Sequence, residues 1–172
     1  MGAISITKAD IASVDADAVV NAANAELRAG SGVCGAIFAA AGRRELQAAC
    51  DEIGHCDTGS AVITPGFALR ARYVIHAVGP RWSGGGSGEP ELLASCYDRA
   101  LELAVEHGCA SVAFPLISSG IYGYPKEEAW RVALAACRVK LAELGDRAPD
   151  VFFCVISDQS LELGERMLAE MA

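Results

Sequence analysis

The sequence is poor in basic and in aromatic residues. Of its 172 residues, 14 are lysine or arginine and 22 are acidic, and aromatic residues make up 6%. The formal net charge of −8 disfavours a protein that grips duplex nucleic acid, RNA or an anionic membrane surface, because such contacts need clustered basic side chains. The chain also lacks an apolar run near the roughly 18 residues that a membrane helix needs. We therefore expect neither a nucleic-acid partner nor a membrane partner.

Targeting signals and metal-site motifs are scarce as well. The start of the chain has no basic segment followed by an apolar stretch, so we expect a cytoplasmic protein. Seven cysteines are scattered along the sequence, which in that compartment predicts free thiols. The cluster of Cys50, His55 and Cys56 matches no zinc signature, and we expect neither a metal nor a cofactor.

Apolar segments, by contrast, are plentiful. Hydrophobic residues make up 52%, which suits one well-buried domain over residues 1–172, and we expect a monomer. Short apolar, β-branched runs predict about six strands, at Ala3–Thr7, Ala18–Asn21, Ser60–Thr64, Tyr73–Val78, Ser111–Pro115 and Val151–Ile156. Apolar gaps of three and four predict helices over 93–104, 129–144, 160–171 and 33–50, the last broken near Gly42. Strands alternating with helices predict an α/β fold, with a mostly parallel sheet between helix layers.

Three glycine-rich segments interrupt this pattern. Ser83–Gly88 is expected to be a mobile loop. Gly30–Gly35 fits G-x-G-x-x-G, but the preceding strand ends near Asn21, too early for a dinucleotide-binding turn, and the acidic residue that should end the next strand is missing. Ser118–Pro125 has no lysine after its glycines and so is no Walker loop. Gly30–Gly35 and Ser118–Pro125 still precede helices, where backbone N–H groups and the helix dipole attract an anion, and at neighbouring strand ends they suit a diphosphate.

Several other residues near these loops have both a structural and a functional interpretation. Tyr122 lies between two glycines, either as a turn filler or as a ring over a sugar or base. Asn21 and Asn24 come off the second strand and Asp10 follows the first, where each has an ordinary capping role. Together with the loops they predict a neutral, hydrogen-bonding site for a sugar–phosphate ligand. His76, within an apolar strand, is expected to be a hydrogen-bonded structural residue rather than a catalyst.

Five motifs in order along the chain resemble those of the macrodomain family, and of its MacroD-type branch in particular. They are Val19–Asn24, Gly30–Ile37, Ala40–Gly42, Val74–Pro80 and Ala113–Pro125. The resemblance extends from about Ile4 to the last predicted helix. It implies a three-layer α/β/α sandwich that binds ADP-ribose.

Carried over position by position, the resemblance also implies a ligand-binding set. Asp10 would accept a hydrogen bond from the adenine amino group, and Asn24 and Tyr122 would hold the distal ribose. The glycine loops would hold the two phosphates, and Phe153 and Asp158 would flank the adenine. The full set is Asp10, Ile11, Asn21, Asn24, Gly30, Ser31, Gly32, Val33, Cys34, Ser118, Ser119, Gly120, Ile121, Tyr122, Phe153 and Asp158.

The sequence departs from the MacroD-type pattern in the first glycine loop. Cys34 stands where that branch has an aspartate, and Phe38 stands where it has a histidine. An ordinary thiol is mostly protonated at pH 7 and does not replace a carboxylate base. A helix N-terminus activates some cysteines, yet no histidine adjoins Cys34 in the sequence to act as its base.

The resemblance implies an enzyme that hydrolyses ADP-ribosyl esters. Its substrates would be proteins mono-ADP-ribosylated on acidic side chains and O-acetyl-ADP-ribose. Asn24 and Tyr122 would be the catalytic positions, with Cys34 in the place of the missing aspartate. The alternative is a module that binds ADP-ribose on proteins without cutting it, and Cys34 favours this reader function. Phosphatase action on ADP-ribose 1″-phosphate is a third possibility.

Overall fold

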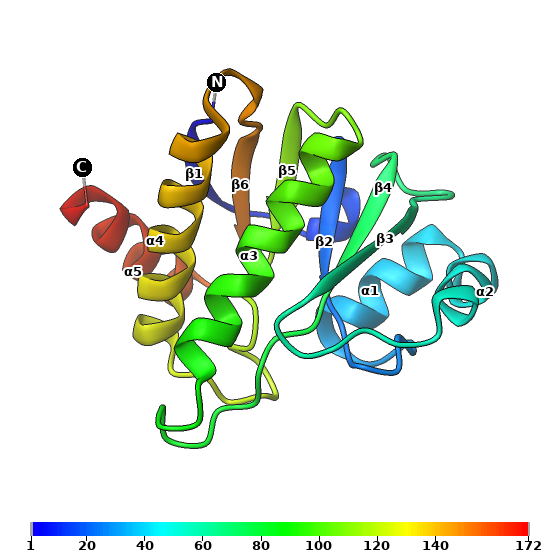
Figure 1. Ribbon diagram of the computed structural model, residues 1–172, viewed down its shortest axis with the longest axis horizontal. Helices are drawn as coiled ribbons and strands as arrows, with labels where there is room; N and C mark the ends of the chain where they lie inside the picture. The colour runs from blue at the N-terminus through cyan, green and yellow to red at the C-terminus, as the bar shows by residue number, and fades with distance from the viewer. Residues whose placement is uncertain (1, 172) are drawn as a thin grey trace.

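A six-stranded sheet forms the centre of the computed structural model, which describes residues 2–171 (Figure 1). The strands are β1 (Ile4–Lys8), β2 (Ala18–Ala22), β3 (Ala61–Pro65), β4 (Tyr73–Ala77), β5 (Ser111–Phe114) and β6 (Asp150–Val155). They are ordered β1-β6-β5-β2-β4-β3, and every neighbouring pair is parallel except β3 with β4. The predicted α/β fold with a mostly parallel, mixed sheet is confirmed, and each predicted strand overlaps an observed one.

Helices cover both faces of this sheet. They are α1 (Gly32–Ala41), α2 (Arg43–Ile53), α3 (Glu89–Glu106), α4 (Lys126–Leu144) and α5 (Asp158–Glu170), with short 3₁₀ turns η1 (Ile11–Ser13) and η2 (Gly145–Arg147). Buried residues of α3, α4 and α5 form one core with the sheet, and those of α1 and α2 form another on the opposite face. The three-layer sandwich implied by the resemblance is confirmed. None of the helices described in residues 2–171 is long and apolar enough to cross a membrane.

The break predicted near Gly42 separates α1 from α2. Gly42 has φ +106°, a backbone conformation that side chains other than glycine rarely adopt. Its N–H donates to the Phe38 carbonyl at 3.1 Å and closes α1, while its own carbonyl accepts from Leu46 at 3.0 Å and opens α2. One glycine therefore turns a single apolar sequence pattern into two helices.

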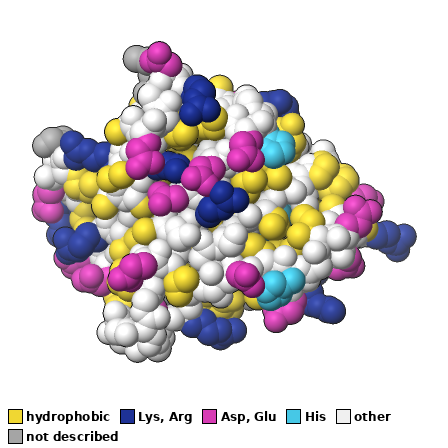
Figure 2. All heavy atoms as spheres, viewed as in Figure 1, with side chains coloured by type: hydrophobic (Ala, Val, Ile, Leu, Met, Phe, Trp, Pro, Cys, Tyr) yellow, Lys and Arg dark blue, Asp and Glu magenta, His cyan; other side chains and the backbone are white. Residues whose placement is uncertain are grey.

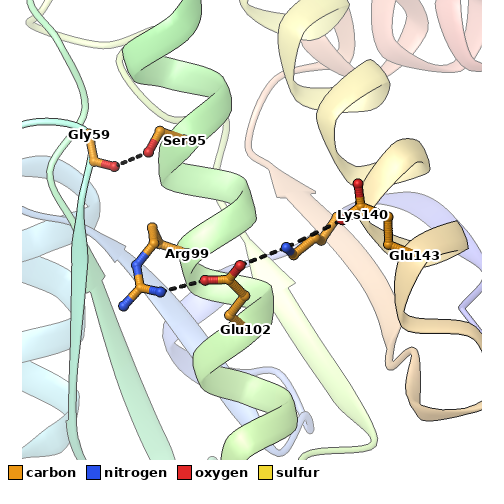
Figure 3. Close-up of polar contacts among 6 residues, drawn as sticks. All are labelled: Gly59, Ser95, Arg99, Glu102, Lys140 and Glu143. Carbon is orange, nitrogen blue, oxygen red and sulfur yellow. Dashed lines mark hydrogen bonds and ion pairs between the residues drawn. The ribbon is translucent and has the colours of Figure 1, made fainter.

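An ion-pair cluster links α3 to α4 (Figure 3). Lys140 of α4 donates to Glu102 of α3 at 2.6 Å, and Arg99 pairs with the other oxygen of the same carboxylate. The hydrogen bond from Lys140 lowers the pKa of Glu102. Ser95 Oγ donates to the Gly59 carbonyl at 2.6 Å and so ties α3 to the segment before β3. Acidic and basic side chains are interspersed over this face of the molecule (Figure 2).

The segment Arg81–Gly88, which we call the strap, connects β4 to α3 and is ordered by one carboxylate. Glu89, the first residue of α3, is 2% exposed and accepts from the Ser83 amide at 2.9 Å and the Ser83 hydroxyl at 3.0 Å. It also accepts from the amides of Gly85 at 3.0 Å and Ser87 at 2.6 Å. These donors, the Ser83 amide first, lower the pKa of Glu89 to about 2. The strap thus differs from the mobile loop expected from its glycines, because its backbone wraps around the carboxylate.

An aromatic cluster fills the core beneath α3 and α4. Phe153 of β6 packs against Tyr97, Phe114 and Trp130, with ring centroids 6.0, 5.7 and 5.2 Å away. Trp130 in turn contacts α5 at Gly164, where an added Cβ would lie 2.6 Å from the indole ring. Glycine at this position therefore lets α5 pack closely on α4.

Replacing Gly164 by Ala is expected to destabilise the protein by about 1–3 kcal/mol, because overpacking against Trp130 outweighs the better helix propensity of alanine. Urea unfolding monitored by tryptophan fluorescence measures the change. Glu165→Ala, at the exposed neighbouring position, is the control and should change stability by no more than about 0.5 kcal/mol. A Gly164→Ala protein as stable as the wild type would contradict the close packing.

Candidate functional site

The predicted site residues other than Phe153 lie at or beyond the edge of the sheet where the five parallel strands end, the lower edge in Figure 1. Along this edge the strands follow the order β1, β6, β5, β2, β4. Asp10 comes after β1, Ser118–Tyr122 after β5, and Asn24 and Gly30–Cys34 after β2. Because β5 and β2 are hydrogen-bonded neighbours, the two glycine-rich loops leave the sheet side by side. In α/β proteins ligands bind beyond this edge.

The loop after β2 ends in the N-terminus of α1 and presents free amides. Gly30 and Ser31 are exposed in the turn before the helix, and Ser31 makes no side-chain cap. The first helical hydrogen bond runs from the Gly35 N–H to the Ser31 carbonyl at 3.3 Å. The N–H groups of Gly32–Cys34 stand ahead of that bond, so they have no helical acceptor and can bind an anion.

Side-chain hydrogen bonds hold the start of this loop in one shape. Asn24 Oδ1 accepts from the Arg28 N–H and Asn24 Nδ2 donates to the Arg28 carbonyl, both at 2.9 Å. Gln47 of α2 donates to the Leu27 carbonyl at 3.0 Å and accepts from the Ala29 N–H at 2.9 Å. The Asn24 amide keeps a second hydrogen and a second lone pair for a ligand. Sequence reasoning missed Gln47, because nothing in the sequence pairs α2 with this loop.

The loop after β5 presents a second set of amides. Ser118 has φ +69°, and its turn lies close to Gly79, where an added Cβ would be 2.2 Å from Ser118 Oγ. Ser119 is half-buried and donates its hydroxyl to a backbone carbonyl at 2.8 Å. The N–H groups of Gly120–Tyr122 have no acceptor among the described residues, and Ile121 is 88% exposed. Three successive free amides supply a second set of donors for an anion.

A buried polar chain lies beneath the two loops. Asn21 Nδ2 donates to His76 Nδ1 at 3.1 Å, and Thr64 Oγ1 lies 3.0 Å from His76 Nε2. Burial lowers the pKa of His76 to about 4, so the ring is neutral, accepting at Nδ1 and donating at Nε2. The expectation of a hydrogen-bonded His76 is confirmed.

Two polar atoms near this edge lack a partner within residues 2–171. Among the described residues, Asn21 Oδ1 and Ser118 Oγ are buried without a hydrogen-bond partner, so a ligand or water can satisfy them.

Cys34 belongs to this buried layer rather than to the open surface. Its side chain is 6% exposed, and its Sγ donates to the Arg28 carbonyl and accepts from Asn21 Nδ2, both at 3.6 Å. The thiol therefore supports the loop from below. Nothing in this arrangement makes it a base at the position where the resemblance places a carboxylate.

The β1 end of the edge holds the residues assigned to adenine. Asp10 is exposed, and its Oδ1 accepts from the Ala12 N–H at 3.0 Å, which caps η1. Ile11 is 4% exposed, so its side chain is part of the core. Asp158 begins α5 and pairs with Lys8 at 3.0 Å.

Phe153 lies away from this edge, contrary to the role assigned to it beside the adenine. It is fully buried in the aromatic cluster and points to the same face as Val151 and Val155, because alternate residues of a strand share a face. The apolar side chain at the carboxyl end of β6 is instead Ile156, which is 83% exposed. Counting the alternation from Val151 would have found this in the sequence.

The sequence predicts free cysteines and no metal site. Within residues 2–171, no three His, Cys, Asp or Glu side chains gather as a metal site would need. All seven cysteines are buried and free. Burial raises the pKa of Cys50 to about 11 and that of Cys96 to about 12, which makes these thiols unreactive.

The fold and the two amide-lined loops define an α/β protein with a candidate anion-binding site at the carboxyl edge of its sheet. The chain belongs to the Macro domain family, whose model matches residues 20–133. It is 53% identical to the Macro domain-containing protein CT2219 of Chlorobaculum tepidum over 94% of this chain and 93% of that protein. It is 43% identical to an O-acetyl-ADP-ribose deacetylase of Cronobacter turicensis over 98% and 97%. A Trypanosoma brucei macrodomain solved in complex with ADP-ribose superimposes with a TM-score of 0.89 at 35% identity, over 96% of this chain and 68% of that one.

Acid is expected to destabilise the protein through His76. In the unfolded chain His76 has its ordinary pKa of 6.5 and takes up a proton below that pH. In the folded chain burial lowers the pKa of His76 to about 4, so the ring stays neutral until the pH falls to that value. Stability is therefore full above pH 6.5 and falls by about 2 kcal/mol between pH 7 and 5. Urea unfolding at the two pH values measures the loss, and His76→Gln, which cannot titrate, should show a smaller one. Equal losses in both proteins would contradict a neutral buried His76.

Proposed function

We propose that this protein binds ADP-ribose along the carboxyl edge of its sheet. Adenine lies over β1 and β6 beside Asp10 and Ile156, the diphosphate over the loops after β5 and β2, and the distal ribose beside Asn24 and Tyr122. From β1 to β4 the edge crosses four gaps between strands, which at about 4.8 Å each is roughly 19 Å. That span suits an extended nucleotide–sugar ligand.

The observation that carries this proposal is the pair of amide sets without acceptors. The N–H groups of Gly32–Cys34 and of Gly120–Tyr122 lie in the segments that follow the adjacent strands β2 and β5. Two phosphates joined by one bridging oxygen match two such sets side by side. A chain of net charge −8 can hold them because backbone dipoles, rather than lysine and arginine, supply the attraction. The ADP-ribose in the Trypanosoma brucei macrodomain supports this choice of ligand.

We propose further that the protein hydrolyses ADP-ribosyl esters, O-acetyl-ADP-ribose and mono-ADP-ribosylated acidic side chains among them. Water adds to the ester carbonyl carbon, a phosphate oxygen of the bound ligand takes its proton, and the ribose oxygen leaves with a proton as a hydroxyl. The products are ADP-ribose and a carboxylic acid. Asn24, held by Arg28, orients the distal ribose, and the amides hold the diphosphate beside the water. The deacetylase relative supports this reaction.

The position of Cys34 favours a second candidate, a module that binds ADP-ribose without cutting it. The thiol is buried under the loop and engaged with Arg28 and Asn21. General-base help contributes about 10²–10⁴ in rate where a base is positioned, and this loop supplies no carboxylate for it. Binding would be unaffected, since the amides that hold the diphosphate belong to the backbone.

Replacing Asp10 by Ala is expected to weaken ADP-ribose binding about fivefold to tenfold, because the adenine amino group loses its acceptor. Titration calorimetry measures the affinity. Asp10→Asn keeps an oxygen for both the Ala12 N–H and the adenine and should bind nearly as the wild type does. Asp15→Ala makes the same change of charge at an exposed position before β2 and should leave the affinity unchanged. Unchanged binding by Asp10→Ala would remove adenine from this end of the edge.

Replacing Cys34 by Asp is expected to raise the rate of acetate release from O-acetyl-ADP-ribose at least about tenfold, since it restores a carboxylate base. Cys34→Ser, of similar size, should leave the wild-type rate within about twofold, because the thiol is not the base. Thermal unfolding confirms that each variant is folded. If the wild type binds ADP-ribose and releases nothing from this ester or from a glutamate-linked substrate, the protein is a reader.

A further inference from the structure

The strap brings a guanidinium group to the proposed distal-ribose end of the site. Arg81 Cζ lies 4.7 Å from the centroid of the Tyr122 ring, a cation–π distance. The backbone N–H of Trp82 donates to the Tyr122 carbonyl at 2.8 Å, and the centroid of the Trp82 ring lies 4.7 Å from that of the Tyr124 ring. Three contacts therefore fix the start of the strap on the loop after β5.

The other end of the strap is fixed as well. The Glu89 carboxylate accepts hydrogen bonds from the amides of Ser83, Gly85 and Ser87, so the segment that carries Arg81 is held at both ends. Beyond Trp82 the strap consists of serine and glycine alone, and this part projects as a white, uncharged surface at the lower edge of the space-filling view (Figure 2). A side chain on such a preorganised segment loses less freedom on binding than one on a mobile loop.

Arg81 keeps its charge available. Glu89 is the nearest acidic residue along the chain, and its carboxylate is occupied by the strap. Arg81 is exposed, and no carboxylate among the described residues pairs with it. The guanidinium lies over one face of the Tyr122 ring, and the Tyr122 side chain is half-buried, so part of it stays accessible. A ribose that contacts an edge of this ring would lie near the Arg81 guanidinium.

We propose that Arg81 is a specificity-determining residue that binds an anionic group attached to the distal ribose. This inference rests on the proposed function, because it needs the ribose beside Tyr122. The planar guanidinium is suited to phosphate and carboxylate oxygens, which it can bind in pairs. Arg81 thereby adds one local cation beside the neutral amides that hold the diphosphate, and it distinguishes ligands that differ only at the sugar end.

Calorimetry with three probes tests the subsite: ADP, ADP-ribose and ADP-ribose 1″-phosphate. The wild type should bind the 1″-phosphate about fivefold more tightly than ADP-ribose. Arg81→Ala should abolish this preference while changing the affinity for ADP, which lacks the distal ribose, less than about twofold. Arg81→Lys should retain part of the preference, because it keeps the charge but not the fork. Arg70→Ala makes the same change of charge at the opposite edge of the sheet, before β4, and should behave as the wild type.

A second arm distinguishes the source of the anion. The probes are two peptides, each mono-ADP-ribosylated on one glutamate that is flanked by either glutamates or glutamines. Each peptide competes with a fluorescent ADP-ribose for the protein at low temperature, which slows hydrolysis of the ester. A preference for the acidic flanks that depends on Arg81 assigns the anion to a protein substrate. Discrimination of the 1″-phosphate alone assigns it to a free phosphorylated ligand. Either result supports the subsite.

Two results would overturn the proposal while leaving the proposed function intact. One is a wild type that binds ADP-ribose but shows no preference for either anion. The other is an Arg81→Ala protein that loses affinity for ADP-ribose and its 1″-phosphate equally, which would give Arg81 only the support of the Tyr122 ring. Failure of the wild type to bind ADP-ribose at all would overturn the proposed function and this inference together.

Discussion

The parallel pairing of β2 with both β4 and β5 is the constraint on which the site depends. It sets Asn21 opposite His76, and it makes the loop after β2 leave the sheet beside the loop after β5. On the other side of β2, the chain leaving β4 passes under the second loop at Gly79, which leaves room for Ser118. The same motifs in a sheet of another order would be separated by one or more strands. The geometry of the site is thus a property of the strand order as much as of the motifs.

The polar chain beneath the loops follows from the same pairing. Asn21 and His76 face the side of the sheet covered by α1 and α2, where an unpaired polar group is costly. The neutral ring accepts from Asn21 Nδ2, and Cys34 adds a weak acceptor for the same Nδ2 from above. A carboxylate in place of Cys34 would bring a charge close to this buried layer. The thiol suits the neutral surroundings, so the departure from the MacroD-type pattern agrees with the local packing.

Much of the fold could be predicted because the sequence carries local signals for it. Buried parallel strands are nearly continuous apolar runs, so they stood out, and Gly42 marked the boundary of two helices. The antiparallel edge strand β3 and the strand order depend on contacts between segments distant in the chain, which no local pattern encodes. The order of the strap cannot be predicted from the sequence, for a related reason. Its glycines suggest a flexible backbone, and only the structure shows that the Glu89 carboxylate accepts hydrogen bonds from the amides of Gly85 and Ser87.

The candidate site was predictable where function follows from the backbone and less so where it depends on side-chain direction. Glycine loops before helices point to anion-binding amides whatever their side chains. The resemblance and its place near the end of the last predicted strand assign Phe153 to the adenine, yet its position in the alternation of β6 turns it into the core and leaves Ile156 at the edge. Cys34 lies in the right loop but faces downward. Residue type names a candidate, and orientation decides its role.

The acidic balance of the chain narrows the ligand more than it excludes one. Charges farther apart than about 8–10 Å are largely screened at physiological salt, so net charge acts mainly on long polyanions that approach much of the surface. A single diphosphate responds to the donors within contact distance, and in the proposed binding mode those are the amides of Gly32–Cys34 and Gly120–Tyr122. Selection among ligands that share the diphosphate must then come from the ends of the edge. In the proposed binding mode Asp10 stands at one end as an acceptor and Arg81 at the other as a cation. Opposite polarity at the two ends gives the edge a direction, which a ligand with an amino group at one end and an anion at the other can follow in only one orientation.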